Sequence, residues 1–95
     1  MNFLKKYGIT EEIIEKIKTK NDPSQITMLL HNEEEVEEII EYFQKIGITV
    51  VDELLISRLD IFFHEVEAIK NEFNKYNIEV LVNLINEDIN AINFI

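Results

Sequence analysis

Apolar residues recur at helical spacing through most of the chain. The longest run lies between residues 33 and 46, where Val36, Ile39, Ile40, Phe43 and Ile46 would share one face of a helix. Shorter stripes of the same kind are Phe3, Leu4 and Tyr7; Ile13, Ile14 and Ile17; Ile26, Leu29 and Leu30; Val51, Leu54 and Leu55; Val66, Ile69, Phe73 and Tyr76; and Leu81, Leu84 and Ile85. The chain has only two glycines and one proline, too few for the turns that a multi-stranded sheet requires. The pattern predicts an all-α fold of about five to seven helices.

Polar residues and glycines mark where these helices begin and end. Thr10 is placed to cap a helix that follows the stop at Gly8, and Asp22, which precedes a proline, is placed to cap the next. Asn32 is expected to cap the main helix, Gly47 to end it and Thr49 to cap the helix that follows. Residues 59–63, "LDIFF", then form a brief turn. Ninety-five residues are too few for two domains, so residues 1–95 are predicted to form a single helical domain.

The apolar pattern repeats when the chain is shifted by thirty residues. The matched pairs are Val36 with Val66, Ile39 with Ile69, Phe43 with Phe73, Ile46 with Tyr76, Ile48 with Ile78, Val50 with Val80, Val51 with Leu81, Leu54 with Leu84, Leu55 with Ile85, Leu59 with Ile89 and Phe62 with Ile92. Such matching predicts a small helical-repeat domain of two and a half units of roughly 30 to 39 residues. Phe43 and Phe73 occupy matching positions, so both are expected to be buried.

The segment from Asn21 to Thr49 resembles one unit of the mitochondrial transcription termination factor family. Its residues on the pattern of that family are Pro23, Leu29, Leu30, Val36, Ile39, Phe43, Gly47 and Ile48. The second unit lacks the proline, and the third has Asn77 in place of the glycine. The resemblance implies a curved helical stack that grips duplex DNA with arginine and lysine. This chain departs from that function, because it has nine lysines and arginines against nineteen acidic residues.

The charge is strongly negative and unevenly placed. The net charge is −10, yet residues 1–20 carry five lysines against three glutamates. The acidic body would repel nucleic-acid phosphates and anionic membranes, and it would attract a protein with a basic surface. No stretch has the pattern of a signal peptide or a membrane span, and the absence of cysteine suits a reducing cytoplasm. We therefore expect a cytoplasmic protein. Its abundant isoleucine and asparagine are typical of AT-rich bacterial or phage genomes.

Six glutamates lie within nine residues at the start of the main helix. They have two interpretations. One is a solvated face, in which like-charge pairs four residues apart cost about 0.2 to 0.5 kcal/mol each and the helix dipole offsets much of that cost. The other is a surface that binds a partner. The predicted partner-binding residues are Glu33, Glu34, Glu37, Glu38 and Glu41.

Catalytic and metal-binding patterns are missing from the sequence. His31 and His64 have no second histidine three or four residues away, so no zinc motif is formed. Ser24 and Ser57 lie in no nucleophile context, and the chain has no glycine-rich phosphate loop. The sequence predicts no catalytic residues, no metal site and no cofactor, and hence a protein that is not an enzyme.

The leading hypothesis is a non-enzymatic, acidic helical module for protein–protein interaction. The first alternative is an acidic inhibitor or immunity-type protein that mimics nucleic acid, as an anti-nuclease or anti-CRISPR protein would. The second is nucleic-acid binding by helical repeats, which the charge disfavours. The apolar end of the chain, with Phe94 and Ile95, is expected either to pack back on the domain or to mediate homo-oligomer formation.

Overall fold

The computed structural model describes all residues, 1–95, and confirms the all-α fold. The chain forms six α-helices and three short 3-10 helices, in the order η1 (Asn2–Tyr7), α1 (Glu11–Lys20), α2 (Pro23–His31), α3 (Glu33–Ile46), α4 (Val51–Ser57), η2 (Leu59–Phe63), α5 (Val66–Phe73), α6 (Ile78–Glu87) and η3 (Ile89–Ile92). The domain measures 34 × 23 × 23 Å. None of its helices is both long enough and apolar enough to cross a membrane.

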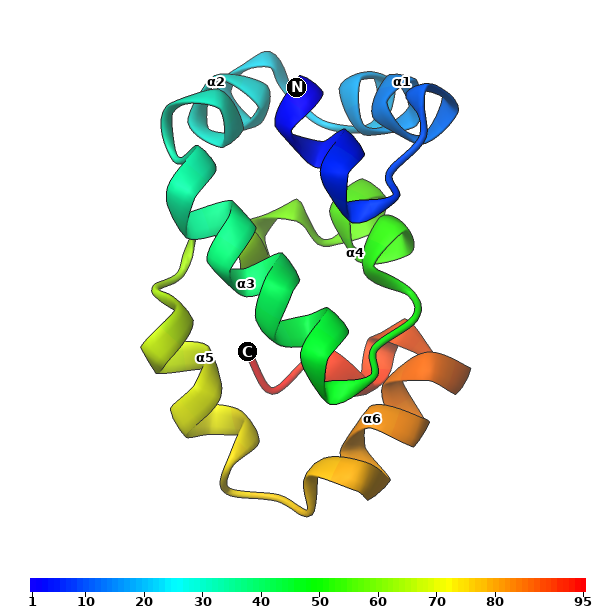
Figure 1. The fold of residues 1–95 in the computed structure, drawn as a ribbon, viewed down its shortest axis with the longest axis vertical. Coiled ribbons are helices and arrows are strands. Elements are labelled where there is room, and N and C mark those ends of the chain that lie inside the picture. Colours follow the sequence, from blue (N-terminus) through cyan, green and yellow to red (C-terminus); the bar gives the residue numbers. More distant parts are fainter.

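Helix α3 crosses the middle of the molecule, and the other elements surround it (Figure 1). Helices α1 and α2 lie at one end of the domain together with the N-terminus, whereas α5 and α6 lie at the other end. Helix α4 packs against α1 and also contacts α3. Since α3 contacts elements at both ends of the domain, it is the element on which the fold is organised.

Several helix boundaries lie where the capping residues predict them. The Thr10 hydroxyl accepts a hydrogen bond from the Ile13 amide at 3.3 Å, and the Gln25 side chain accepts one from the Asp22 amide at 3.1 Å. Gly47 ends α3 with a φ of 101°, a conformation that only glycine adopts without strain. These local contacts explain why the sequence pattern located the helices.

Two of the expected caps act differently in the structure. Asn32 does precede α3, but its side-chain amide donates backward to the carbonyl of Met28 at 2.7 Å. Thr49 does not cap α4, which begins one residue later than expected, after Val50. The amide of Thr49 instead donates to the side chain of Asn86 at 2.9 Å, while the Asn86 amide donates to the Gly47 carbonyl at 3.0 Å. Asn86 therefore joins α6 to the turn between α3 and α4.

The core contains twenty-two buried residues, all of them apolar. Helix α3 contributes Val36, Ile39, Ile40 and Phe43, each fully buried, as its stripe predicted. The rings of Phe43 and Phe62 meet edge to face with their centroids 5.7 Å apart. No buried side-chain polar atom lacks a hydrogen-bond partner. Hydrophobic burial around α3 is thus the main source of stability.

Three apolar side chains that the stripes assign to the interior are exposed. Leu30 is 42% exposed, Leu84 is 50% exposed and Tyr76 is 49% exposed. Tyr76 also lies beyond the end of α5, which is shorter than its apolar pattern suggested. Periodicity identifies one face of a helix, but it does not reveal whether another element covers the whole of that face.

The order of elements repeats together with the sequence pattern. Helices α3 and α4 with η2 are followed by α5 and α6 with η3, and Leu59 and Ile89, thirty residues apart, begin the two 3-10 helices. Phe43 and Phe73 are both fully buried, which confirms the expectation for this matched pair. The elements η1, α1 and α2 precede these two copies of the unit. We refer below to α3–α4–η2 as the first copy and to α5–α6–η3 as the second.

The C-terminal segment packs back onto the domain. The ring of Phe94 lies 5.4 Å from that of Phe73 and 5.1 Å from that of Tyr76, measured between centroids. Ile95 is partly buried against the same core. Of the two arrangements expected for Phe94 and Ile95, the structure shows the first, in which they pack back on the domain.

Candidate interaction surface

The predicted glutamates lie on the side of α3 that faces away from the core. Glu33, Glu34, Glu38 and Glu41 are exposed, and Glu37 is partly buried. Because residues four apart share one face of a helix, Glu34 and Glu38 lie side by side, and Glu41 is one turn further along. We call Glu34, Glu38 and Glu41 the outer ridge of α3. Its fully buried opposite side anchors the ridge to the core.

Two of the five predicted glutamates already have partners within the chain. The Tyr7 hydroxyl lies 2.8 Å from Oε1 of Glu37 and 2.7 Å from Oε1 of Glu41, and its single proton serves one carboxylate at a time. The Lys6 ammonium forms an ion pair with Glu37. The side chain of Gln44 donates to the Tyr7 carbonyl at 3.0 Å. These contacts hold η1 against one side of α3.

The charges at this contact shift the pKa values of the groups that form it. The hydrogen bond from Lys6, followed by that from Tyr7, lowers the pKa of the Glu37 carboxyl. The same pair with Glu37 raises the pKa of the Lys6 ammonium. Burial, together with the hydrogen bonds to Glu41 and Glu37, raises the pKa of the Tyr7 hydroxyl. At neutral pH the contact therefore joins a carboxylate, an ammonium and a neutral phenol.

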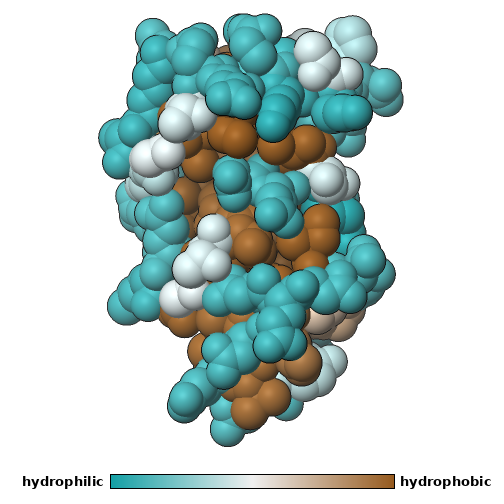
Figure 2. Space-filling model, turned by 90° about the vertical axis from the view of Figure 1, so that its right-hand side faces the viewer, coloured by the Kyte–Doolittle hydropathy of each residue, from teal (hydrophilic) through white to brown (hydrophobic).

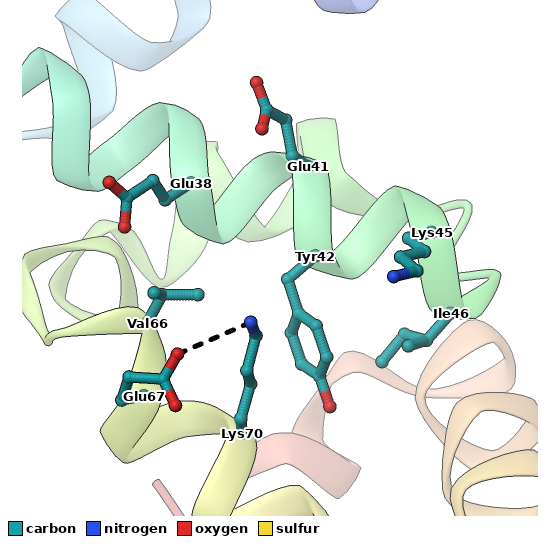
Figure 3. Close-up of a pocket in the computed structure, with 8 residues that line it drawn as sticks. All are labelled: Glu38, Glu41, Tyr42, Lys45, Ile46, Val66, Glu67 and Lys70. Carbon is teal, nitrogen blue, oxygen red and sulfur yellow. Dashed lines mark ion pairs between the residues drawn. The ribbon is translucent and has the colours of Figure 1, made fainter.

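A cleft of about 420 Å³ separates α3 from α5 on the other side of the ridge (Figure 3). Eight residues line it: Glu38, Glu41, Tyr42, Lys45, Ile46, Val66, Glu67 and Lys70. The Tyr42 ring forms its inner wall, where it meets Phe73 edge to face at 5.8 Å, and burial raises the pKa of its hydroxyl. Lys70 lies 5.6 Å from the centre of that ring and 3.5 Å from a carboxylate oxygen of Glu67. The Glu41 carboxylate points out of the cleft.

Most cations of the chain are already paired. Seven of the nine lysines and arginines form ion pairs, each with a different acidic residue, so twelve of the nineteen acidic residues have no cationic partner. Glu33, Glu34, Glu35 and Glu38 are among those twelve, and all four are exposed. The first half of α3 is therefore a concentrated negative surface on which only Glu37 forms an ion pair.

The geometry offers little for chemistry of other kinds. No three histidine, cysteine, aspartate or glutamate side chains come together in a group that could hold a metal ion. His31 and His64 are both exposed, at the end of α2 and directly after η2. The cleft beside Tyr42 contains carboxylates and ammonium groups, but it is open at the surface (Figure 3). The main feature of this surface is the negative charge of the exposed glutamates on α3.

The sequence reasoning missed the contact of η1 with α3. Lys6 and Tyr7 lie thirty or more residues away from Glu37 and Glu41, and no local pattern joins them. The available signal was the charge of residues 1–20, which is opposite in sign to that of the glutamate run. Opposite charges of this kind make docking of the N-terminal segment on α3 favourable.

No protein-family model matches this chain, and neither a curated protein nor a solved structure matches it. The resemblance to repeats of the mitochondrial transcription termination factor family stays a hypothesis.

Proposed function

We propose that this protein is a non-enzymatic, acidic helical module that binds a protein partner with a basic surface. The observation that carries the proposal is the outer ridge of α3. Glu34 and Glu38 are exposed, lack a cationic partner and are fixed in direction by a helix whose other side is fully buried. Charges held in this way need little ordering when a partner binds, so more of the interaction energy contributes to affinity.

The contact with η1 supports the same partner chemistry. An ammonium group and a phenol hydroxyl already bind Glu37 and Glu41 within the chain. A basic protein would offer lysine, arginine and tyrosine to Glu34 and Glu38 in the same manner. Of the five predicted glutamates, Glu37 and Glu41 already have partners within the chain, so the proposal assigns Glu34 and Glu38 to the protein partner.

The balance of charge favours a protein over a nucleic acid as the partner. Binding to a phosphate backbone requires several cations on one face, and this chain has only two that are not in ion pairs, Lys20 and Lys45. The unpaired acidic residues would repel phosphates and would speed the approach of a basic protein.

Two matched double variants test the proposal. Glu34→Gln with Glu38→Gln removes two charges from the ridge, whereas Glu53→Gln with Glu65→Gln removes two exposed, unpaired charges from α4 and from the residue before α5. Each protein is immobilised and used to capture partners from lysate of its source cells at low salt, with identification by mass spectrometry. We expect basic proteins to be retained by the wild type and by the Glu53→Gln, Glu65→Gln variant, and to be lost from the ridge variant.

Salt and nucleic acid serve as controls on the mechanism. Raising the ionic strength from about 0.01 to about 0.1 M shortens the Debye length from about 30 to about 10 Å and should weaken capture. Equal capture by both double variants would contradict the role of the ridge, and capture of no basic protein would contradict the function. If DNA displaces a captured nucleic-acid enzyme, the acidic inhibitor hypothesis replaces the general module.

A further inference from the structure

An apolar stripe on helix α6, continued by the residue just before it, is only half covered by the rest of the chain. Val80 and Leu84 are 55% and 50% exposed, and Tyr76, just before the helix, is 49% exposed. The spacing of four residues places Val80 and Leu84 on one face of α6. Figure 2, which views the molecule from the right-hand side of Figure 1, shows hydrophobic side chains gathered over α6 at its lower end. A hollow of about 170 Å³ lies along the stripe, between Tyr76 and Leu84.

The two copies of the unit show what kind of surface this is. The residues of the first copy that match Tyr76, Val80 and Leu84 are Ile46, Val50 and Leu54. Leu54 is fully buried, and Ile46 and Val50 are partly buried against the core. In the first copy, these three positions therefore form part of a contact with other helices of the domain. In the second copy the same positions are about half exposed.

The stripe is held in place before any partner arrives. Leu81 and Ile85 are buried on the inner side of α6, and the Asn77 side chain caps the helix by accepting from the Val80 amide at 3.1 Å. The ring of Phe94 supports the ring of Tyr76 from behind, with their centroids 5.1 Å apart. A preformed apolar surface of this kind loses little entropy on binding.

We propose that the stripe of Tyr76, Val80 and Leu84 docks an amphipathic helix of a protein partner whose polar residues are basic. The inference rests on the proposed function in that the partner is a protein, but it assigns the apolar contact to α6, away from the outer ridge of α3. The hollow is smaller than the roughly 300 to 1,000 Å³ of small-molecule sites, so it suits one apolar side chain of a helix.

Charge around the stripe defines the polar residues of the partner. Residues 77–95 contain three acidic residues, Glu79, Glu87 and Asp88, and no lysine or arginine. Lys75, which precedes the helix, is paired with Glu72 at 3.0 Å. Basic residues that flank the apolar face of a partner helix would meet these carboxylates, whereas acidic ones would be repelled.

A second copy of this chain fits the stripe less well. A two-fold contact through α6 would bring Glu79 and Glu87 against the same residues of another molecule of charge −10. This repulsion favours a helix of opposite charge over a second copy.

The test uses the full chain and designed peptides as probes. One peptide of about eighteen residues, long enough to be helical, carries leucines at helical spacing on one face and lysines on the other. A second replaces the lysines with glutamates, and a third shuffles the leucines. Binding is measured by fluorescence anisotropy and located by amide chemical shifts. The protein variants are Val80→Ser with Leu84→Ser and, as a matched control, Glu34→Gln with Glu38→Gln. Circular dichroism checks that both variants fold.

We expect the leucine–lysine peptide to shift the amides of residues 76–87 and to bind the Val80→Ser, Leu84→Ser variant about tenfold more weakly or worse. The Glu34→Gln, Glu38→Gln variant should keep its affinity within about threefold. If the peptide shifts α3 instead and ignores the α6 changes, the inference fails while the proposed function stands. If the glutamate peptide binds as tightly as the lysine peptide, the proposal that the partner helix is basic is wrong. If the protein forms dimers that depend on concentration and that Val80→Ser with Leu84→Ser abolishes, the stripe binds a second copy of this chain instead.

Discussion

The rings of Phe43 and Phe73, thirty residues apart in the sequence, are in contact at the centre of the domain, with centroids 5.6 Å apart and planes inclined by 32°. Each comes from the same position of its copy of the unit, on α3 and on α5 respectively. The two copies therefore meet through equivalent residues. This pair is one part of the core that depends on both copies being folded.

Truncation of either phenylalanine should be severely destabilising. We expect Phe43→Ala and Phe73→Ala each to lower the free energy of unfolding by about 3 to 5 kcal/mol, because both rings are fully buried and leave a cavity. The double variant should lose less than the sum, since the rings are in contact. Urea denaturation measures this, with Met28→Ala at an exposed site as the control. If either variant is as stable as the wild type, the substituted phenylalanine is not part of the core.

The hydroxyl of Tyr7 should stabilise the N-terminal segment. Tyr7→Phe removes the hydrogen bond to Glu37 or Glu41 and keeps the ring, and we expect it to cost about 1 kcal/mol. Tyr76→Phe is the matched control, because the Tyr76 hydroxyl makes no hydrogen bond within the chain. Thermal unfolding of both variants gives the comparison. An equal effect at the two tyrosines would show that the Tyr7 contact contributes nothing.

The ion pair of Glu37 should make stability depend on pH in a defined direction. The folded-state pKa of Glu37 is lowered, so its contribution is complete above the unfolded value of about 4.3 and is lost as pH falls through the folded value. We expect the wild type to be more stable than Glu37→Gln at pH 7, and the difference to shrink below about pH 4.

Melting temperatures at a series of pH values measure that difference. Glu53→Gln is the control, because Glu53 is exposed and pairs with no cation. A Glu37→Gln difference that stays constant down to pH 2 would show that Glu37 acts through its shape and not its charge.

Removing charge from the ridge should affect the three glutamates differently. Glu34→Gln with Glu38→Gln relieves a like-charge pair four residues apart, so stability should be unchanged or higher by about 0.2 to 0.5 kcal/mol. Glu41→Gln should be less stable than that double variant, because it replaces a charged acceptor of the Tyr7 hydroxyl with a neutral one and leaves Glu37 as the only carboxylate there. Chemical denaturation separates the two cases. Equal loss in both would mean that all three glutamates are structural.

The sequence predicts most of the fold because its helices are encoded locally. The Thr10 cap, the stop at Gly47 and the apolar stripe of α3 all act within a few residues. Contacts between distant segments carried no such signal. The pairing of Tyr7 with Glu37 and the bridge from Asn86 to the α3–α4 turn depend on how helices pack. For the same reason the sequence placed Leu84 inside, although only a neighbouring helix would cover it.

The bridge made by Asn86 couples the two copies mechanically. The Asn86 side chain donates to the Gly47 carbonyl and accepts from the Thr49 amide, so it satisfies two backbone groups of the turn between α3 and α4. If α6 detached, both backbone groups would lose their partners at once. Local opening of the second copy is therefore tied to fraying of the first, and the domain should unfold as one cooperative unit, not one copy at a time.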